Sequence, residues 1–339
     1  MNVQEQARKR WDSIAKPLHS LGRLEDLVVQ IAGIRQTADV RIGKRCVLVF
    51  CGDHGVVREG VSQTGSGVTA LVARSIAEGT GNISLMAKEA QADVIAVDMG
   101  MLSPVDGTVD RRTGAGTTDI AVGPAMTREQ AEQAMQAGVD MMRDMRDRGY
   151  EIAVIGEMGI GNTTAASAVA SVLLRRPVRE VTGRGAGLSD TGLERKIAAI
   201  ERAVRVNQPD PDDPTGVLAK LGGFEIAGMA GAFLGGYRYG IPVVMDGMIT
   251  AVSALIAARI CPETVSAILP SHASSEPAAR MILEELGMTP VIHADMALGE
   301  GTGGVLLLPL LDMALRVYHG THTFEGLGME AYTPQEGAE

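Results

Sequence analysis

Residues 152–164, Ile-Ala-Val-Ile-Gly-Glu-Met-Gly-Ile-Gly-Asn-Thr-Thr, decide the fold of this chain. A short apolar run ends at Glu157, passes through a glycine-rich loop and enters an Ala-rich segment at Asn162. This order is typical of a buried strand that turns directly into a helix. Free backbone N–H groups at such a helix start could hold a phosphate, but a tight strand-to-helix turn explains the same residues.

Similar short apolar runs recur along the chain, and each is followed by small, acidic or polar residues. The expected strands cover residues 46–51, 94–97, 152–155, 243–245 and 267–269. The expected helices between them cover residues 69–88, 128–148, 163–174, 193–206, 226–237, 250–258 and 277–286. This alternation predicts an α/β fold with an open, mostly parallel, Rossmann-like sheet. Helices should cover both faces, and ligands should bind beyond the carboxyl ends of the strands.

The two ends of the chain lie outside this alternation. Helices expected over residues 3–36 and an apolar segment after Thr302 together predict a small helical domain built from both chain ends. The expected division is residues 1–40 for the N-terminal helices, 41–300 for the α/β sheet domain and 301–339 for the C-terminal helix and tail. Residues 207–215, with three prolines and three aspartates, predict a linker.

The composition argues against several classes of protein. The 339 residues include 41 Asp and Glu against 31 Lys and Arg, and aromatic residues make up 3%. An acidic chain with few rings to stack on bases argues against a nucleic-acid partner. The longest apolar run, residues 303–317, is interrupted by Pro309 and Asp312 and is shorter than the roughly 20 residues that span a bilayer. We therefore expect a core helix there and no membrane anchor.

The N-terminal residues and the spacing of the cysteines bear on the cellular compartment of the protein. Residues 1–16 lack the apolar stretch of a secretory signal. Cys46, Cys51 and Cys261 lack the close spacing of a zinc site or a redox dithiol. We expect a reduced, cytoplasmic enzyme that acts on small molecules.

Two further glycine-rich segments are candidates for chemistry. Residues 182–187, Thr-Gly-Arg-Gly-Ala-Gly, precede a helix that carries Lys196. A flexible loop with a nearby cation could close over a phosphate, although a solvated loop and helix face explain the same residues. In residues 298–304, Leu-Gly-Glu-Gly-Thr-Gly-Gly, Glu300 is enclosed by glycines beside an apolar helix. A carboxylate in apolar surroundings suits a general base, whereas helix capping is the structural alternative.

The remaining polar clusters carry weaker signals. Asp53-His54 and His272 follow expected strands and could bond a ligand, but a buried histidine bonded to backbone is the commoner case, so their role stays open. His293, His319 and His322 lack the spacing of a metal site and are assigned no role. The loop after Gly156 lacks the third glycine and the following acidic strand end of a dinucleotide-binding fingerprint. This argues against an NAD-linked oxidoreductase without eliminating it.

Five motifs, in this order, are similar to those of the nicotinate-nucleotide:dimethylbenzimidazole phosphoribosyltransferase family. They are Lys16-Pro17 with Ser20-Leu21-Gly22-Arg23-Leu24-Glu25, Gly52-Asp53-His54-Gly55-Val56-Val57, residues 156–164, Gly183-Arg184-Gly185 and Leu298-Gly299-Glu300-Gly301-Thr302-Gly303. The resemblance covers residues 16–320. It implies an α/β sheet domain, a small helical domain from both chain ends, and a dimer.

The resemblance also implies a reaction. Phosphoribose passes from nicotinate mononucleotide to the aromatic base of the cobalamin lower ligand, with inversion at the anomeric carbon, and the products are nicotinate and an α-ribazole 5′-phosphate. The pyridine of the donor is already cationic and departs as neutral nicotinate, so we expect no metal and no cofactor. Glu300 is implied to be the base that takes the ring N–H proton of the acceptor.

The donor-binding residues follow from the same resemblance. Glu157 is placed at the ribose and nicotinate side, although it could instead brace the loop, and Lys196 and Ser274 are placed toward the phosphate. The other implied substrate-binding residues are Gly159, Gly161, Asn162, Thr163, Gly185, Gly301 and Gly303.

The acceptor side departs from the family pattern. After Gly60-Val61-Ser62 the family continues Tyr-Pro-Gln-Glu-Val-Thr, whereas this chain has Gln63-Thr64-Gly65-Ser66-Gly67-Val68-Thr69. We expect a reshaped acceptor pocket, which leaves a benzimidazole, a purine or a phenol open. Its expected border is Ser62, Gln63, Ser66 and Leu298.

A homodimer is the expected assembly. The alternatives are a phenol- or p-cresol-activating member that works as a heterodimer with a paralogue, an NAD-linked oxidoreductase, and a non-catalytic subunit. Retention of Glu300 favours an active enzyme over the last of these.

Overall fold

A six-stranded, all-parallel sheet forms the centre of the computed structural model, which describes residues 1–333. Its strands are β1 (Arg45–Gly52), β2 (Ala92–Gly100), β3 (Val109–Asp110), β4 (Ile152–Met158), β5 (Val243–Met245) and β6 (Ile268–Pro270). Their spatial order is β3-β2-β1-β4-β5-β6, so the direction of winding reverses between β1 and β4. This is the doubly wound order, in which ligands bind at the carboxyl ends of the strands beside the reversal. The predicted α/β fold is confirmed.

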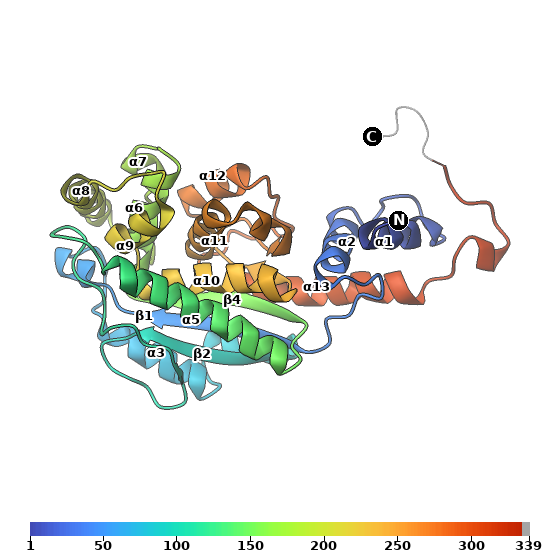
Figure 1. Cartoon of the computed structure of the whole chain (residues 1–339), viewed down its shortest axis with the longest axis horizontal. Coiled ribbons are helices and arrows are strands. Elements are labelled where there is room, and N and C mark those ends of the chain that lie inside the picture. Colours follow the sequence, from blue (N-terminus) through green and yellow to red (C-terminus); the bar gives the residue numbers. More distant parts are fainter. Residues whose placement is uncertain (334–339) are drawn as a thin grey trace.

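Helices cover both faces of the sheet (Figure 1). The described helices are α1 (Val3–Ser13), α2 (Arg23–Arg35), η1 (Gly55–Glu59), α3 (Gly67–Ala77), α4 (Asn82–Glu89), α5 (Arg128–Asp147), α6 (Asn162–Leu173), α7 (Val178–Val181), α8 (Asp190–Asn207), α9 (Pro214–Leu221), α10 (Phe224–Tyr239), α11 (Met248–Ile260), η2 (Pro262–Ala267), α12 (Pro277–Glu285), α13 (Thr302–Gly320) and η3 (Glu325–Leu327). None of those described over residues 1–333 is long and apolar enough to cross a membrane.

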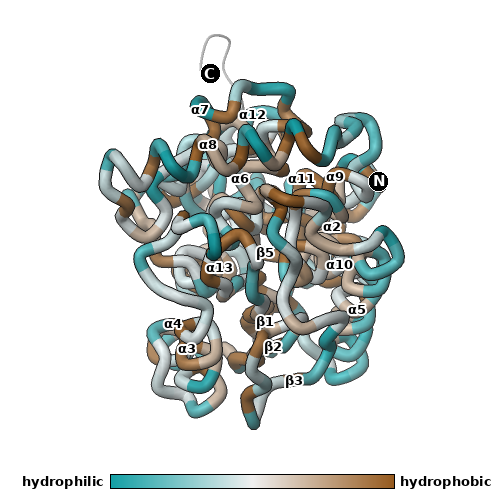
Figure 2. Tube along the Cα trace, turned by 90° about the vertical axis from the view of Figure 1, so that its left-hand side faces the viewer, coloured by the Kyte–Doolittle hydropathy of each residue, from teal (hydrophilic) through white to brown (hydrophobic). Residues whose placement is uncertain are grey.

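Side chains of β1 alternate between two apolar cores. Leu48 and Phe50 belong to the core that includes α5, α6, α10 and α11, whereas Val47 and Val49 belong to the core that includes α3, α4 and α13. This is the two-sided burial that an unbroken apolar strand requires. Figure 2 shows the apolar residues gathered along the central strands, with hydrophilic residues on the outer turns.

Close approach of α5 and α10 depends on glycine. A Cβ at Gly138 would lie 1.8 Å from the Gly228 carbonyl oxygen, and one at Gly231 would lie 1.8 Å from the Met135 carbonyl oxygen. Two helix backbones in such contact have no room for a side chain between them. Part of the glycine content, 42 of the 339 residues, therefore serves helix packing and not the loops.

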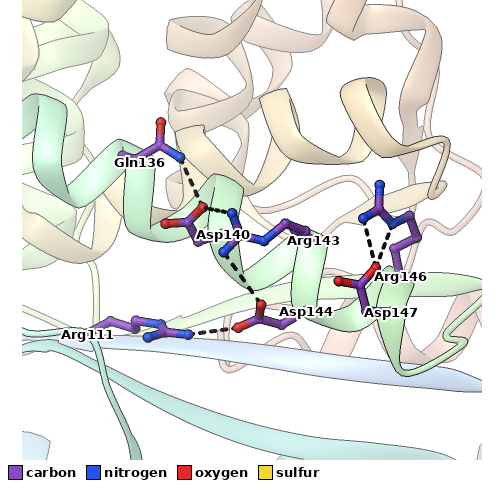
Figure 3. Close-up of polar contacts among 7 residues, drawn as sticks. All are labelled: Arg111, Gln136, Asp140, Arg143, Asp144, Arg146 and Asp147. Carbon is purple, nitrogen blue, oxygen red and sulfur yellow. Dashed lines mark hydrogen bonds and ion pairs between the residues drawn. The ribbon is translucent and has the colours of Figure 1, made fainter.

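The outer face of α5 carries a chain of polar contacts (Figure 3). Arg143 pairs with Asp140 at 2.8 Å and with Asp144 at 3.8 Å, and Arg111, just after β3, pairs with Asp144 at 2.8 Å. Exposed pairs of this kind each contribute little to stability. They attach the short edge strand to α5 and lie apart from the cavities described below.

Two sequence predictions were wrong in detail. The single helix expected over residues 69–88 is divided into α3 and α4, because Gly79 has a φ of +77° and Gly81 starts a new helix. The strand β3 was missed, since two residues carry no periodic signal. The core helix expected over residues 303–317 is confirmed as α13, which continues through Pro309.

Helices from both chain ends pack together. The rings of Trp11 in α1 and Tyr318 in α13 lie 4.9 Å apart, and the Phe324 N–H donates to the Ser13 carbonyl at 2.9 Å. Figure 1 shows α1 and α2 beside the C-terminal part of α13. The N-terminal end of α13 instead contacts the sheet, since a Cβ at Gly304 would lie 2.5 Å from Val154. The boundaries at residues 40 and 300 stay predictions.

Candidate active site

A cavity of about 260 Å³ lies at the carboxyl ends of the strands, beside the reversal of the strand order. Its lining comes from the loop after β4, the glycine-rich segment before α8, the ends of β5 and β6, and the segment that precedes α13. The sequence-predicted residues that line it are Glu157, Gly159, Asn162, Thr163, Gly185, Ser274, Leu298 and Glu300. The topology thus brings together segments that are far apart in the chain.

Glycines let the loop after β4 pack on the end of β1. A Cβ at Gly159 would lie 2.4 Å from the Gly52 carbonyl oxygen, and Gly161 has a φ of +97°. The Ile160 N–H donates to the Thr69 hydroxyl at 3.1 Å, and that hydroxyl donates to Asp53 at 2.6 Å. Asp53 therefore supports the loop from behind and does not line the cavity.

Glu157 ends β4 with its carboxylate buried. The Asn162 amide donates to this carboxylate, and a Cβ at Gly299 would lie 2.6 Å from the Glu157 Oε1. Burial raises the pKa of Glu157 to about 8, and the nearby Asp246 carboxylate contributes to that rise. At neutral pH the group therefore holds a proton that it can donate to a ligand oxygen.

Glu300 sits in a turn with an unusual backbone. Gly299, Glu300 and Gly301 have φ values of +84°, +61° and +89°, a left-handed run that only flanking glycines tolerate easily. The Glu300 carboxylate accepts from the Ile83 N–H at 3.3 Å and from the Asn82 amide at 3.5 Å, so it faces the start of α4. The start of α4 therefore fixes the orientation of the Glu300 side chain.

Asp246 holds this turn from the other side. It follows β5, is buried, and accepts from the Gly301 N–H at 3.2 Å and the Gly304 N–H at 2.9 Å. Burial raises the pKa of Asp246, and His272, whose Nδ1 lies 3.7 Å away, opposes that shift. Gly303 packs on the His272 ring, where a Cβ would lie 2.1 Å from Nδ1. Gly301 and Gly303 thus shape the turn from outside the cavity lining.

A buried cation lies behind the part of the cavity lining formed by Thr163 and Gly185. Lys196 on α8 donates to the Thr163 hydroxyl at 2.9 Å and to the Gly183 carbonyl at 3.1 Å. Gly185, with a φ of +53°, lies so close that a Cβ there would be 3.5 Å from the Lys196 Nζ. Burial lowers the pKa of Lys196 to about 8, and Glu276 opposes that shift.

A second, smaller cavity of about 70 Å³ adjoins the first along the loop Gly159–Thr163. Ser62 and Gln63 line it, and the Gln63 amide donates to the Ala186 carbonyl at 3.0 Å. Ser66 precedes α3 and lines neither cavity. Leu298 lines the larger cavity and is 54% exposed.

His54 forms a buried pair with Glu225, its Nε2 lying 2.5 Å from Oε1. A Cβ at Gly161 would come within 3.0 Å of the His54 Cβ, so the pair packs under the glycine-rich loop. Like Asp53, it lies behind the cavity lining.

A family model described as Phosphoribosyltransferase matches residues 1–328. The chain belongs to this phosphoribosyltransferase family. Among its relatives, the nicotinate-nucleotide–dimethylbenzimidazole phosphoribosyltransferase of Acetivibrio thermocellus is 42% identical over 333 residues, which cover 98% of this chain and 95% of the relative. The protein of the same name from Roseiflexus sp. is 44% identical over 326 residues, covering 95% and 92%. The resemblance found in the sequence is confirmed.

Solved structures agree with these relatives. CobT from Thermus thermophilus superposes on this phosphoribosyltransferase with a TM-score of 0.90 at 38% identity, over 97% of this chain and 99% of that one. The names of these proteins give no support to an oxidoreductase, a phenol-activating enzyme or a non-catalytic subunit.

Sequence reasoning missed two acidic residues of the phosphoribosyltransferase site. Asp246 directly follows the strand expected over residues 243–245, so its position carried a signal. Nothing in the local sequence indicated its hydrogen bonds to Gly301 and Gly304. Glu276 carried none, because its partner, the Gly185 N–H at 2.9 Å, is 91 residues away.

Proposed function

We propose that this phosphoribosyltransferase transfers the phosphoribosyl group of nicotinate mononucleotide to dimethylbenzimidazole or a closely related aromatic base. The products are nicotinate and an α-ribazole 5′-phosphate, inverted at the anomeric carbon. One observation carries the proposal. A single cavity is lined both by the buried residue Glu300 and by Gly185 and Thr163, which the Lys196 ammonium supports from behind.

The reaction needs one bond to form as another breaks. A ring nitrogen of the acceptor attacks the anomeric carbon with its lone pair, and the bond from that carbon to the pyridine nitrogen breaks. Its electron pair neutralises the pyridinium, so nicotinate leaves without added acid. The acceptor would otherwise become cationic, and its ring N–H proton passes to the Glu300 carboxylate.

The other residues bind and orient the donor. In this proposal Thr163, Gly185 and Ser274, which line the cavity, bind the donor phosphate, and Lys196 supplies positive charge from behind Thr163. Glu157, protonated at neutral pH, donates toward the ribose. The cavity is lined mainly by backbone and apolar side chains, which keep competing water from the anomeric carbon.

Replacement of Glu300 by glutamine tests the mechanism, because it removes the base and nearly preserves its shape. We expect nicotinate release to fall by about 10²–10⁴-fold, while calorimetry shows unchanged binding of nicotinate mononucleotide. Glu89→Gln, an exposed carboxylate on α4, is the matched control and should leave turnover unchanged. Unaffected turnover in Glu300→Gln would remove Glu300 from the mechanism.

The acceptor is tested by a panel of bases. Wild-type protein and nicotinate mononucleotide are incubated separately with dimethylbenzimidazole, benzimidazole, adenine and phenol, and the riboside phosphate is measured by mass spectrometry. We expect dimethylbenzimidazole or benzimidazole to rank first. A ranking led by phenol would contradict the proposed acceptor class, although it would still support phosphoribosyl transfer as the reaction.

The proposal includes a homodimer in the cytoplasm. Leu306, Leu310 and Met313 form one apolar stripe on α13, and Met313 is 63% exposed, which supports a second copy packing there. Cys46 and Cys51 are buried free thiols, as is usual for cytoplasmic proteins. Light scattering that gives the mass of one chain at micromolar concentration would contradict the dimer.

A further inference from the structure

Glu276 is a carboxylate that the proposed chemistry does not use. It precedes α12, yet its side chain does not cap that helix. Its Oε1 instead accepts from the Gly185 N–H at 2.9 Å, and its Oε2 is buried without a hydrogen-bond partner among residues 1–333. A Cβ at Gly183 would lie 2.1 Å from Oε2, so the glycine segment closes tightly around this carboxylate.

The carboxylate of Glu276 lies near Lys196 without bonding to it. Its negative charge acts on the Lys196 ammonium, but within the described part of the chain the two form no ion pair, and the ammonium donates to the Thr163 and Gly183 oxygens. A buried cation is ordinarily paired with an anion. Among the described residues, Lys196 therefore has Glu276 as a nearby counter-charge but no ion-pair partner.

The groups around Glu276 are those that a phosphate monoester binds. A phosphate accepts hydrogen bonds from the backbone N–H groups of a glycine-rich segment and forms an ion pair with a lysine ammonium. In the structure one of those donors, the Gly185 N–H, is already taken by a carboxylate. A dianionic phosphate at this position would find the hydrogen-bond donor that it needs, the Gly185 N–H. It would also be repelled by the negative charge of the Glu276 carboxylate beside it.

We infer that Glu276 occupies the donor-phosphate subsite of the free enzyme and is displaced from the Gly185 N–H when the phosphate of the donor binds. This rests on the proposed function for the identity of the donor. In the free enzyme Glu276 keeps the glycine segment ordered and gives Lys196 a partial counter-charge. On binding, the phosphate takes the Gly185 N–H and pairs with Lys196, and the Glu276 side chain turns outward from its half-buried position. Its return would assist departure of the phosphorylated product.

Glu276→Gln tests this inference by removing the charge and keeping the length of the side chain. We expect calorimetry to show nicotinate mononucleotide binding about tenfold more tightly than to wild type, because the like charge is gone. Binding of nicotinate riboside, which lacks the phosphate, should not change. Glu284→Gln, which removes an exposed carboxylate on the same helix, is the control and should match wild type in both.

A purely structural role predicts a different result. If Glu276 only braced the loop, Glu276→Gln would change the affinities for the nucleotide and the riboside by the same factor, or would weaken both. Either outcome overturns the inference. Glu276→Asp keeps the charge but is too short to hold the Gly185 N–H, and it serves if the glutamine variant fails to fold. Because that N–H is then free for the phosphate, we again expect tighter nucleotide binding with unchanged riboside binding.

The inference and the proposed function fail separately. If wild type binds no nicotinate mononucleotide, the donor is misidentified. Titration with inorganic phosphate then still decides the role of Glu276. Tighter phosphate binding by Glu276→Gln than by wild type supports the inference, and equal or weaker binding overturns it.

Discussion

Replacing Gly156 by alanine perturbs the Glu300 turn without changing any polar side chain. Gly156 lies within β4, directly beneath that turn, and a Cβ there would lie 2.4 Å from the Glu300 carbonyl carbon and oxygen and from the Gly301 nitrogen. Ordinary contact begins at 3.4 Å, so the turn must move by about 1 Å, a displacement that can reduce catalysis by about 10²-fold. Overpacking of this kind also destabilises a protein by about 1–3 kcal/mol.

The expected result for Gly156→Ala is a kcat reduced by roughly 10²-fold, with the KM for nicotinate mononucleotide changed much less. The reason is that the proposed function puts the donor phosphate near Gly185, which contacts Thr163 and Lys196 and not the Glu300 turn. Nicotinate release measures both constants, and circular dichroism confirms folding. Gly123→Ala adds a methyl group where no atom lies within 4 Å and serves as the control. A folded Gly156→Ala protein with wild-type kcat would refute the claim that the position of this turn governs turnover.

Three further predictions concern other parts of the site. The folded-state pKa of Glu157, about 8, exceeds its ordinary value. The folded state therefore binds more protons than the unfolded state between pH 4.5 and 8, and stability falls as pH rises through that window. In Glu157→Gln this loss of stability should disappear, which Tm measured at pH 5 and pH 8 will show. Lys196 is charged below its pKa of about 8, so affinity for nicotinate mononucleotide should weaken from pH 7 to pH 9, and a Lys196→Met variant should bind weakly with a flat profile in calorimetry. Replacing Gly65-Ser66 by Gln-Glu should change the ranking of acceptor bases, and an unchanged ranking would show that this segment does not select the acceptor.

Local sequence was sufficient for most of the fold. The strand β4 and the helix α6 follow from an apolar run, a glycine-rich loop and an Ala-rich segment, all of which are short-range signals. The break between α3 and α4 was missed although Gly79 and Gly81 stand close together, because glycine within a helical pattern is often tolerated. The positive φ of Gly79 shows that the helix ends there. The same limit applies to β3, whose pairing with β2 depends on a partner and not on its own residues.

Candidate site residues were recognisable from the sequence only where neighbouring residues in the chain shape their surroundings. Glu300 and the loop Gly159–Thr163 were recognisable because the residues that shape each turn are its immediate neighbours in the chain. Glu276 was not recognisable, because the group that its carboxylate binds is the N–H of a distant glycine. Ser66 was placed at the acceptor pocket by resemblance alone, and it lines neither cavity.

The sequence by itself determined the order of strands and helices, the positions of the glycine-rich turns and the family to which the chain belongs. Only the tertiary structure decided how acidic or basic the side chains of the site are. The pKa of Glu157 rises because burial removes water and because Asp246, Glu225 and Glu300, from three distant segments, lie close to it. Burial and distance between charges act through space, so they exist only once the chain has folded.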